Sequence, residues 1–325
     1  MKKFVLKSMF AAVLVAAVLA GCKKEKTEDI DLDTSAAEDN AVTENVSSDI
    51  NSIASQAADE SNSSLSNFRI DDGSSVLSSC ATVVRDTINR IVTVTFNGGT
   101  CIDGRTRSGV LTFNYSASPV GSRHYRDPGF TCTVTSSNYV VDGNQVNIVN
   151  KTITNTTNGG NPIGYDPMTM NETWHITADI NITRTNGVVL TWNCDRTKEL
   201  LNTSSVCPAS DFVNFPFSDT IPINWLQARV GITGSATGTR TYNNVTESVT
   251  INITNQLVRD FGGCPNLGGR HPFIQGELDH TRSGRPTRHM NFGSDGVGNI
   301  NNACDLWVQI SFTVNGTPHT VYRQL

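Results

Sequence analysis

The sequence predicts an all-β protein whose main domain is a large antiparallel meander of long hairpins. From residue 68 onward, apolar and polar residues alternate with a period of two, which is typical of strands with one buried face. Asn-Gly and Asp-Gly dipeptides separate these runs, and no apolar pattern of helical period competes with them. Strands of this length favour a sandwich-like domain, or one twisted sheet folded on itself.

The first 21 residues have the organisation of an export signal peptide. Basic residues come first, and the apolar run that follows, residues 9–20, is too short to cross about 30 Å of hydrocarbon as a helix. The run ends in Leu19-Ala20-Gly21-Cys22, and this arrangement resembles a bacterial lipoprotein signal. The resemblance implies a mature protein that begins at Cys22 and is anchored in a membrane by lipid on that residue, palmitate among its acyl chains. By the sorting rule of such proteins, Lys23 favours the outer membrane, and the charged stretch after it is also typical of display on the cell surface.

Residues 22–67 are predicted to form a lipidated N-terminus and a flexible acidic tether. Ser, Ala, Asn, Asp and Glu dominate this segment, which therefore buries too little apolar surface to offset the entropy of ordering it. The formal charge of the whole chain is −5, and because the tether is strongly acidic, the domain over 68–325 is close to neutral. This balance argues against nucleic acid as a partner. An alternative for part of the tether is a short amphipathic helix, indicated by a weak helical spacing of Ile50, Ile53, Ala54, Ala57 and Ala58.

Turn chemistry predicts the register of several hairpins. A two-residue turn at Asn315-Gly316 places Ile310 opposite Val321. At Asn186-Gly187 a three-residue loop is needed to keep the apolar residues on one face. That loop pairs Ile182 with Leu190, and Ile180 with Trp192.

Two further features concern charge and domain organisation. A turn at Asn243-Asn244 places Arg240 opposite Glu247, a cross-strand pair contributing about 0.2 to 1 kcal/mol. The Gly- and Asn-rich stretch 158–164 offers a boundary between two subdomains within 68–325.

Eight cysteines are present, and assigning Cys22 to lipid leaves seven in an oxidising compartment. Seven is odd, so at least one has no partner within the chain. The absence of any C-x-x-C spacing gives zinc or iron–sulfur sites little support, and we expect no metal and no cofactor. The spacing of the cysteines does not determine which of them pair. The disulfides that we expect are Cys80 with Cys101, Cys194 with Cys207, and Cys264 with Cys304. Cys132 is then left unpaired, in a strand pattern where a cysteine fills the core.

One C-terminal stretch gathers the residue types that carry metal or acid–base chemistry: His271, Glu277, Asp279, His280 and His289. A tight turn at Ser283-Gly284 places His280 and His289 on one side of the sheet, with backbones about 7 to 8 Å apart. Glu277 and Asp279 alternate onto the other face. This geometry favours exposed polar strand residues over a site, and the charged turns at 103–107 and 126–129 are interpreted in the same way. Trp307 is the best candidate for an exposed aromatic platform, because it falls opposite the aliphatic residues of its strand.

Several local motifs resemble a family of β-rich Bacteroidota-type outer-membrane lipoproteins that has no assigned activity. They are Cys101-Ile102-Asp103-Gly104-Arg105 with Gly109, Tyr125-Arg126-Asp127-Pro128-Gly129, Pro272-Phe273-Ile274-Gln275-Gly276, Asn291-Phe292-Gly293, Cys304-Asp305 and Val314-Asn315-Gly316. The resemblance implies an envelope lipoprotein and carries over no catalytic or binding residue.

Two hypotheses of function follow. The first is a non-enzymatic binding or structural protein of the cell envelope, with a protein or a glycan as ligand. The alternative is an envelope carbohydrate-active or hydrolytic enzyme whose carboxylates the sequence does not locate.

Overall fold

A computed structural model of the chain describes residues 35–59, 80–101, 103–119, 125–161, 163–166, 169–203, 228–260, 263–264 and 273–324. The signal region, Cys22 and the predicted boundary at residue 68 lie outside these residues. The part of the chain from Thr34 to Leu325 forms one compact unit.

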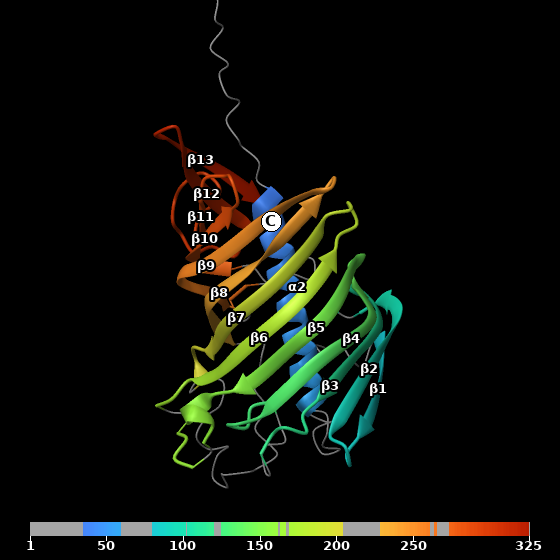
Figure 1. Ribbon diagram of the computed structural model, residues 1–325. Helices are drawn as coiled ribbons and strands as arrows, with labels where there is room; N and C mark the ends of the chain where they lie inside the picture. The colour runs from blue at the N-terminus through green and yellow to red at the C-terminus, as the bar shows by residue number, and fades with distance from the viewer. Residues whose placement is uncertain are drawn as a thin grey trace, which may run out of the picture. The chain divides into compact units, whose positions relative to one another are not determined.

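In the described part of the chain, thirteen strands form a single antiparallel sheet in which each strand pairs with the next along the chain (Figure 1). The sheet is open, with β1 and β13 as its two edges. The predicted antiparallel meander of long hairpins is therefore confirmed. The strands are β1 (Ala81–Asp86), β2 (Ile91–Thr100), β3 (Thr106–Asn114), β4 (Thr131–Val141), β5 (Asn144–Asn155), β6 (Glu172–Thr183), β7 (Val189–Leu200), β8 (Arg229–Tyr242), β9 (Val245–Asp260), β10 (Phe273–Arg282), β11 (Arg288–Asn291), β12 (Trp307–Val314) and β13 (Thr317–Gln324).

The hairpin registers expected from turn chemistry are confirmed. Ile310 lies opposite Val321, and Asn315 and Gly316 both have the positive φ that their turn requires. Ile182 pairs with Leu190 across the three-residue loop, and Ile180 pairs with Trp192. Arg240 lies opposite Glu247 in the β8–β9 pair.

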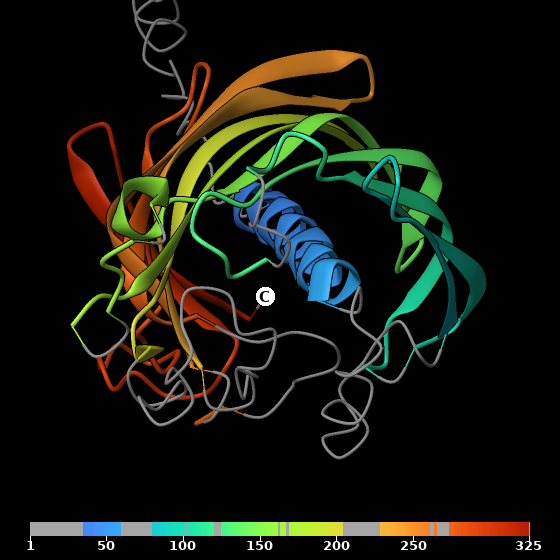
Figure 2. The same cartoon turned by 90° about the horizontal axis from the view of Figure 1, so that it is seen from below.

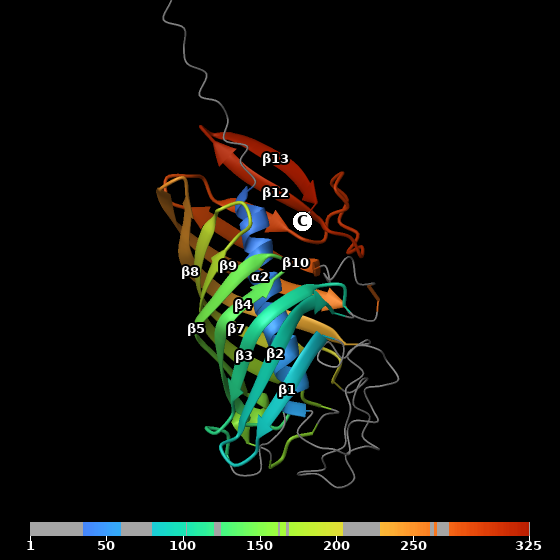
Figure 3. The same ribbon diagram turned by 90° about the vertical axis from the view of Figure 1, so that its right-hand side faces the viewer.

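The sheet curves around helix α2 (Ser35–Asp59), which lies across its concave face (Figures 2 and 3). Bulges contribute to this curvature, because an extra residue in one strand bends the ladder and increases its twist. Two of them fall at Gly109 and Gly234, where the register shifts and φ is +89° and +111°. A Cβ at either position would lie within 2.2 Å of a carbonyl oxygen on the neighbouring strand, so only glycine fits.

Helix α2 corrects the prediction of a flexible tether for residues 35–59. Ile50 and Ile53 are completely buried and belong to the same core as the concave side chains of the sheet. The weak helical spacing over residues 50–58 indicated part of this helix. The helix has five Ser and three Asn, residues with little intrinsic helix propensity, so its stability comes from packing on the sheet.

The stretch 158–164 is a connection within the sheet and not a boundary between subdomains. It overlaps a short 3₁₀ turn, η2 (Thr157–Gly160), and the strands before and after it, β5 and β6, pair with each other. None of the described helices combines the length and the hydropathy that crossing a bilayer requires.

Two of the three predicted disulfides are present, Cys80–Cys101 and Cys264–Cys304. The third is wrong, because Cys194 is a buried free thiol on the concave side of β7. Its expected partner, Cys207, lies outside the described residues. Cys132 is free and buried in β4, as predicted.

Candidate functional site

The strongest concentration of functional groups is the interface between helix α2 and the concave face of the sheet. The helix carries five acidic residues and no basic one. Three of the acidic side chains, Asp39, Glu44 and Asp49, are buried and form ion pairs with the sheet and its loops. Their partners are Arg184 and Arg240 for Asp39, Arg196 for Glu44, and Arg105 and Arg107 for Asp49.

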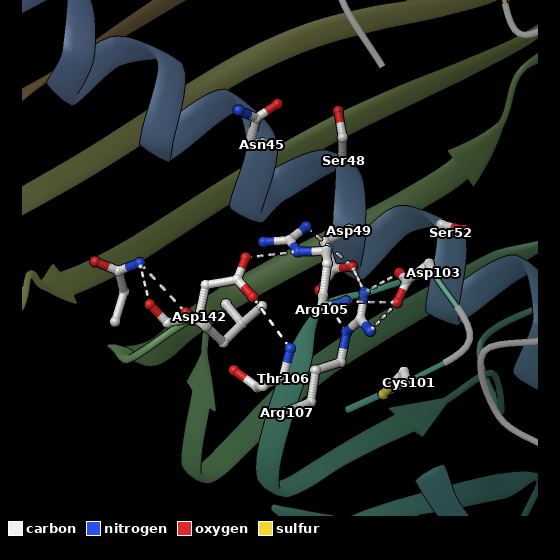
Figure 4. A network of polar contacts seen from close by, with 12 residues as sticks. Asn45, Ser48, Asp49, Ser52, Cys101, Asp103, Arg105, Thr106, Arg107 and Asp142 are labelled. Carbon is white, nitrogen blue, oxygen red and sulfur yellow. Dashed lines mark hydrogen bonds and ion pairs between the residues drawn. The ribbon is translucent and has the colours of Figure 1, made fainter. Parts of the chain in front are cut away.

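Asp49 is the best-connected carboxylate of the helix (Figure 4). Its Oδ2 accepts hydrogen bonds from Arg107 Nε at 3.2 Å and from the Tyr139 hydroxyl at 2.9 Å, and Arg107 Nη2 donates to Oδ1. Arg105 Nη1 lies 3.2 Å from the same Oδ1. Burial and the Asp49 charge raise the pKa of Tyr139 well above its usual value, so this phenol keeps its proton and acts as a donor.

The two arginines around Asp49 are tied into the sheet by further carboxylates. Arg107 donates to both oxygens of Asp103, at 2.9 and 2.6 Å, and Arg105 Nε donates to Asp142 Oδ2 at 2.8 Å. Burial acts to raise the pKa of Asp103, but the hydrogen bonds and charge of Arg107 outweigh it and the pKa is lowered. The charged turn at 103–107, interpreted from sequence as a simple turn, is therefore part of the helix-binding surface.

The N-terminal part of α2 is held by a second set of arginines. Asp39 accepts from Arg240 Nε at 2.6 Å and from Arg184 Nη1. The predicted cross-strand pair of Arg240 and Glu247 is present but long, with 4.0 Å between Nη1 and Oε2. Glu247 also pairs with Arg285 at 2.9 Å, so it links the β8–β9 hairpin to the next turn of the sheet.

A row of small side chains lies on the concave face of the central strands. Ala178, Cys194 and Ala236 are partners across β6, β7 and β8, and all three are buried. Two longer buried side chains, Lys151 opposite Ala178 and Arg196 two residues beyond Cys194, donate hydrogen bonds to Ser47 and Glu44 of α2.

The predicted cluster of histidines and carboxylates does not form one site. His280 lies opposite Arg288 and not Thr287, so the β10–β11 connection is one residue longer than predicted. As a result His280 points into the concave side and is buried, whereas His289 lies opposite Asp279 on the convex face, with 2.5 Å between Nδ1 and Oδ1. Burial, and then the charge of Arg282, lowers the pKa of His280 to about 4. His271 lies outside the described residues.

The remaining candidates make structural contacts. Glu277 accepts hydrogen bonds from Asn255 and Asn291 on the two neighbouring strands. Arg126 of the second charged turn forms a two-point ion pair with Glu172. Trp307 is not an open platform, because Gly296 packs on its ring so closely that a Cβ there would lie 2.6 Å from the indole.

The sequence did not predict that basic residues line an interface, although a signal for this exists. Leu190, Trp192, Cys194 and Arg196 occupy alternate positions of β7 and all face the concave side. An arginine in register with an apolar face indicates that the face meets something polar. Among the described residues, no group of three or more His, Cys, Asp or Glu side chains is arranged to hold a metal ion.

Comparisons with known proteins found no match: no family model matches the chain, and neither a curated protein nor a solved structure does. The resemblance to Bacteroidota-type lipoproteins therefore stays a prediction, and function has to be argued from the geometry of the interface.

Proposed function

We propose that this protein is a lipid-anchored protein of the outer membrane with a non-enzymatic binding or structural role, in which the concave face of the sheet is the binding surface. The observation that carries the proposal is the set of buried ion pairs to Asp39, Glu44 and Asp49. The guanidinium group of arginine is suited to bind a carboxylate, because it offers two parallel N–H donors in one fixed plane. The ligand class that fits this surface is an acidic, polar peptide segment, and α2 is such a segment.

Docking of α2 has a direct consequence for a lipid on Cys22. With α2 released, residues 22–80 would link the lipid to strand β1, and an extended chain spans about 3.3 to 3.6 Å per residue, or roughly 200 Å. With α2 docked, only residues 22–34 are left, which limits the span to about 45 Å. The docked helix thus holds the sheet near the membrane surface, and this is the structural role that we propose.

Metabolic labelling with palmitate tests the anchor. The wild-type chain should take up label and fractionate with the outer membrane, and Cys22→Ser should lose both properties. Cys132→Ser is the matched control, because it removes a cysteine that is buried in the sheet and should keep the label. Label that persists in Cys22→Ser would contradict the proposed anchor.

Screens for turnover test the non-enzymatic role. The proposal expects no hydrolysis of envelope glycans, peptides or esters by the purified chain. A hydrolytic activity that disappears when one carboxylate is changed, Glu277→Gln for instance, would overturn it in favour of an envelope hydrolase.

A further inference from the structure

One turn of helix α2, from Glu44 to Ser48, is surrounded by three buried cations from three strands. Arg196 of β7 donates to Glu44 Oε1 at 2.5 Å, and Lys151 of β5 donates to Ser47 Oγ at 3.0 Å. Arg259 of β9 donates to Ser48 Oγ at 2.8 Å and to Asn45 Oδ1 at 3.3 Å. We name Lys151, Arg196 and Arg259 the turn cations.

The turn cations are not neutralised by the groups that they contact. Glu44 is the one carboxylate that contacts them within the described part of the chain, and the other contacts are neutral oxygens. Three positive charges and one negative charge leave a formal excess of two. The exposed fractions of all four side chains are 5% or less, so water screens this excess poorly.

Two of the turn cations also have unused hydrogen-bonding capacity. Nε and Nη1 of Arg196 and Nε of Arg259 are buried and have no hydrogen-bond partner among the described residues. A guanidinium carries five N–H donors, and leaving a buried charged donor unpaired is costly. Both guanidiniums also lie near aromatic rings, Arg196 at 5.9 Å from the centre of Trp192 and Arg259 at 4.2 Å from that of Phe273, but rings supply no net charge.

We propose that the turn cations bind a small inorganic anion, either a halide or a tetrahedral oxyanion. This anion supplies negative charge that a second carboxylate would otherwise have to provide. Such an anion would accept hydrogen bonds from the unpaired N–H groups of Arg196 and Arg259, and it would neutralise part of the excess positive charge. This inference concerns how α2 is held on the sheet and does not depend on which ligand the protein meets in the envelope.

Neighbouring groups do not supply the missing charge. Burial raises the pKa of Cys132 to about 12 and that of Cys194 to about 11, so both thiols beside Lys151 are neutral near pH 7. Burial lowers the pKa of Lys151 to about 8, with Cys194 and Glu44 opposing the shift. Burial also lowers the pKa of Arg259 to about 10, Glu44 opposing it and Arg105 adding to it. The Asp49 cluster differs, because it sets three carboxylates, Asp49 among them, against two arginines.

Thermal unfolding of the full chain at constant ionic strength tests the proposal. Sodium gluconate is replaced stepwise by sodium chloride, and in a second series by sodium phosphate. A ligand that binds only the folded state raises Tm in a saturable way that follows its concentration relative to Kd. A rise with phosphate alone would identify an oxyanion site, and a rise with both would identify a general anion site. Equal Tm values in all three salts would overturn the proposal.

Variants assign the effect to the turn cations. Arg196→Met and the milder Arg259→Gln should each weaken the apparent anion affinity at least tenfold. Arg126→Met is the matched control, because it removes an arginine with its own carboxylate partner, Glu172, and should keep the anion response even though stability falls. An unchanged response in both test variants would contradict the site. Should neither test variant fold, crystals of the wild-type chain grown in bromide should show anomalous density beside Arg196 or Arg259, and its absence would contradict the site equally.

Discussion

Asp49 and Arg107 lie 58 residues apart in the chain and form a buried two-point ion pair. The Arg107 side chain is completely inaccessible to solvent and that of Asp49 is 5% exposed. This pair joins the helix to β3, and a third residue, Tyr139 of β4, donates to the same carboxylate.

Removing Asp49 should therefore be strongly destabilising. Asp49→Ala leaves Arg107 and Arg105 buried without one of their carboxylates, and we expect the free energy of unfolding to fall by about 3 to 5 kcal/mol. Denaturant unfolding of the full chain measures this. Glu38→Ala, on an exposed position of the same helix, should change it by less than about 0.5 kcal/mol. Equal effects of the two changes would contradict the ion-paired interface.

Lys151 should be a residue whose removal stabilises the protein. Its folded pKa of about 8 is below the unfolded value near 10.5, so the charged form is disfavoured by folding at pH 7, and this penalty fades only as pH rises from 8 toward 10.5. Lys151→Met keeps the packing and loses one hydrogen bond to Ser47. In gluconate at pH 7 we expect a gain of about 1 to 3 kcal/mol, shrinking above pH 8. A loss of stability at pH 7 would show that the lysine is better neutralised than the geometry indicates.

His280 should make stability depend on mildly acidic pH. Its folded pKa of about 4 is below the unfolded value near 6.5, so its contribution is complete above pH 6.5 and is lost as pH falls toward 4. The expected loss is on the order of 3 kcal/mol at most. His280→Leu should flatten the curve of unfolding free energy between pH 6.5 and 4. A curve parallel to that of the wild type would exclude the buried neutral imidazole.

Cys132 and Cys194 should resist alkylation in the folded protein. Both are buried, and burial raises the pKa of each thiol, so neither forms a reactive thiolate near pH 8. Mass spectrometry of the two peptides after iodoacetamide treatment should find both unmodified in the native chain and both modified after unfolding without reductant. Recovery of Cys194 in a disulfide with Cys207 would contradict the structure and restore the pairing expected from sequence.

The sequence predicted the strands well, because each register rests on neighbouring residues. Ile182 and Leu190 are eight residues apart, and only one loop length keeps them on one face. The same reasoning was available at the β10–β11 connection, where Leu278 pairs with Met290 on the buried face. The two-residue turn assumed there separated these apolar residues and put His289 on the wrong side.

Helix α2 could not be predicted in this way. Its composition is that of a disordered segment, and the groups that stabilise it are distant in sequence: Arg107 is 58 residues from Asp49, and Arg240 is 201 residues from Asp39. Local propensity carries no information about such partners. Only the inward-facing arginines of the strands, Arg196 for example, indicated that the concave face holds something acidic.

The measurement that tests the central claim most directly is hydrogen exchange of the backbone amides of residues 35–59 in the native full chain. Docking of α2 on the concave face predicts protection of Val46 to Ala57 comparable with that of strand β6. It also predicts that neutralising Asp39, Glu44 and Asp49 together, as Asn, Gln and Asn, abolishes this protection while β6 stays protected. Exchange of the wild-type segment at the rate of an unfolded peptide would contradict the account.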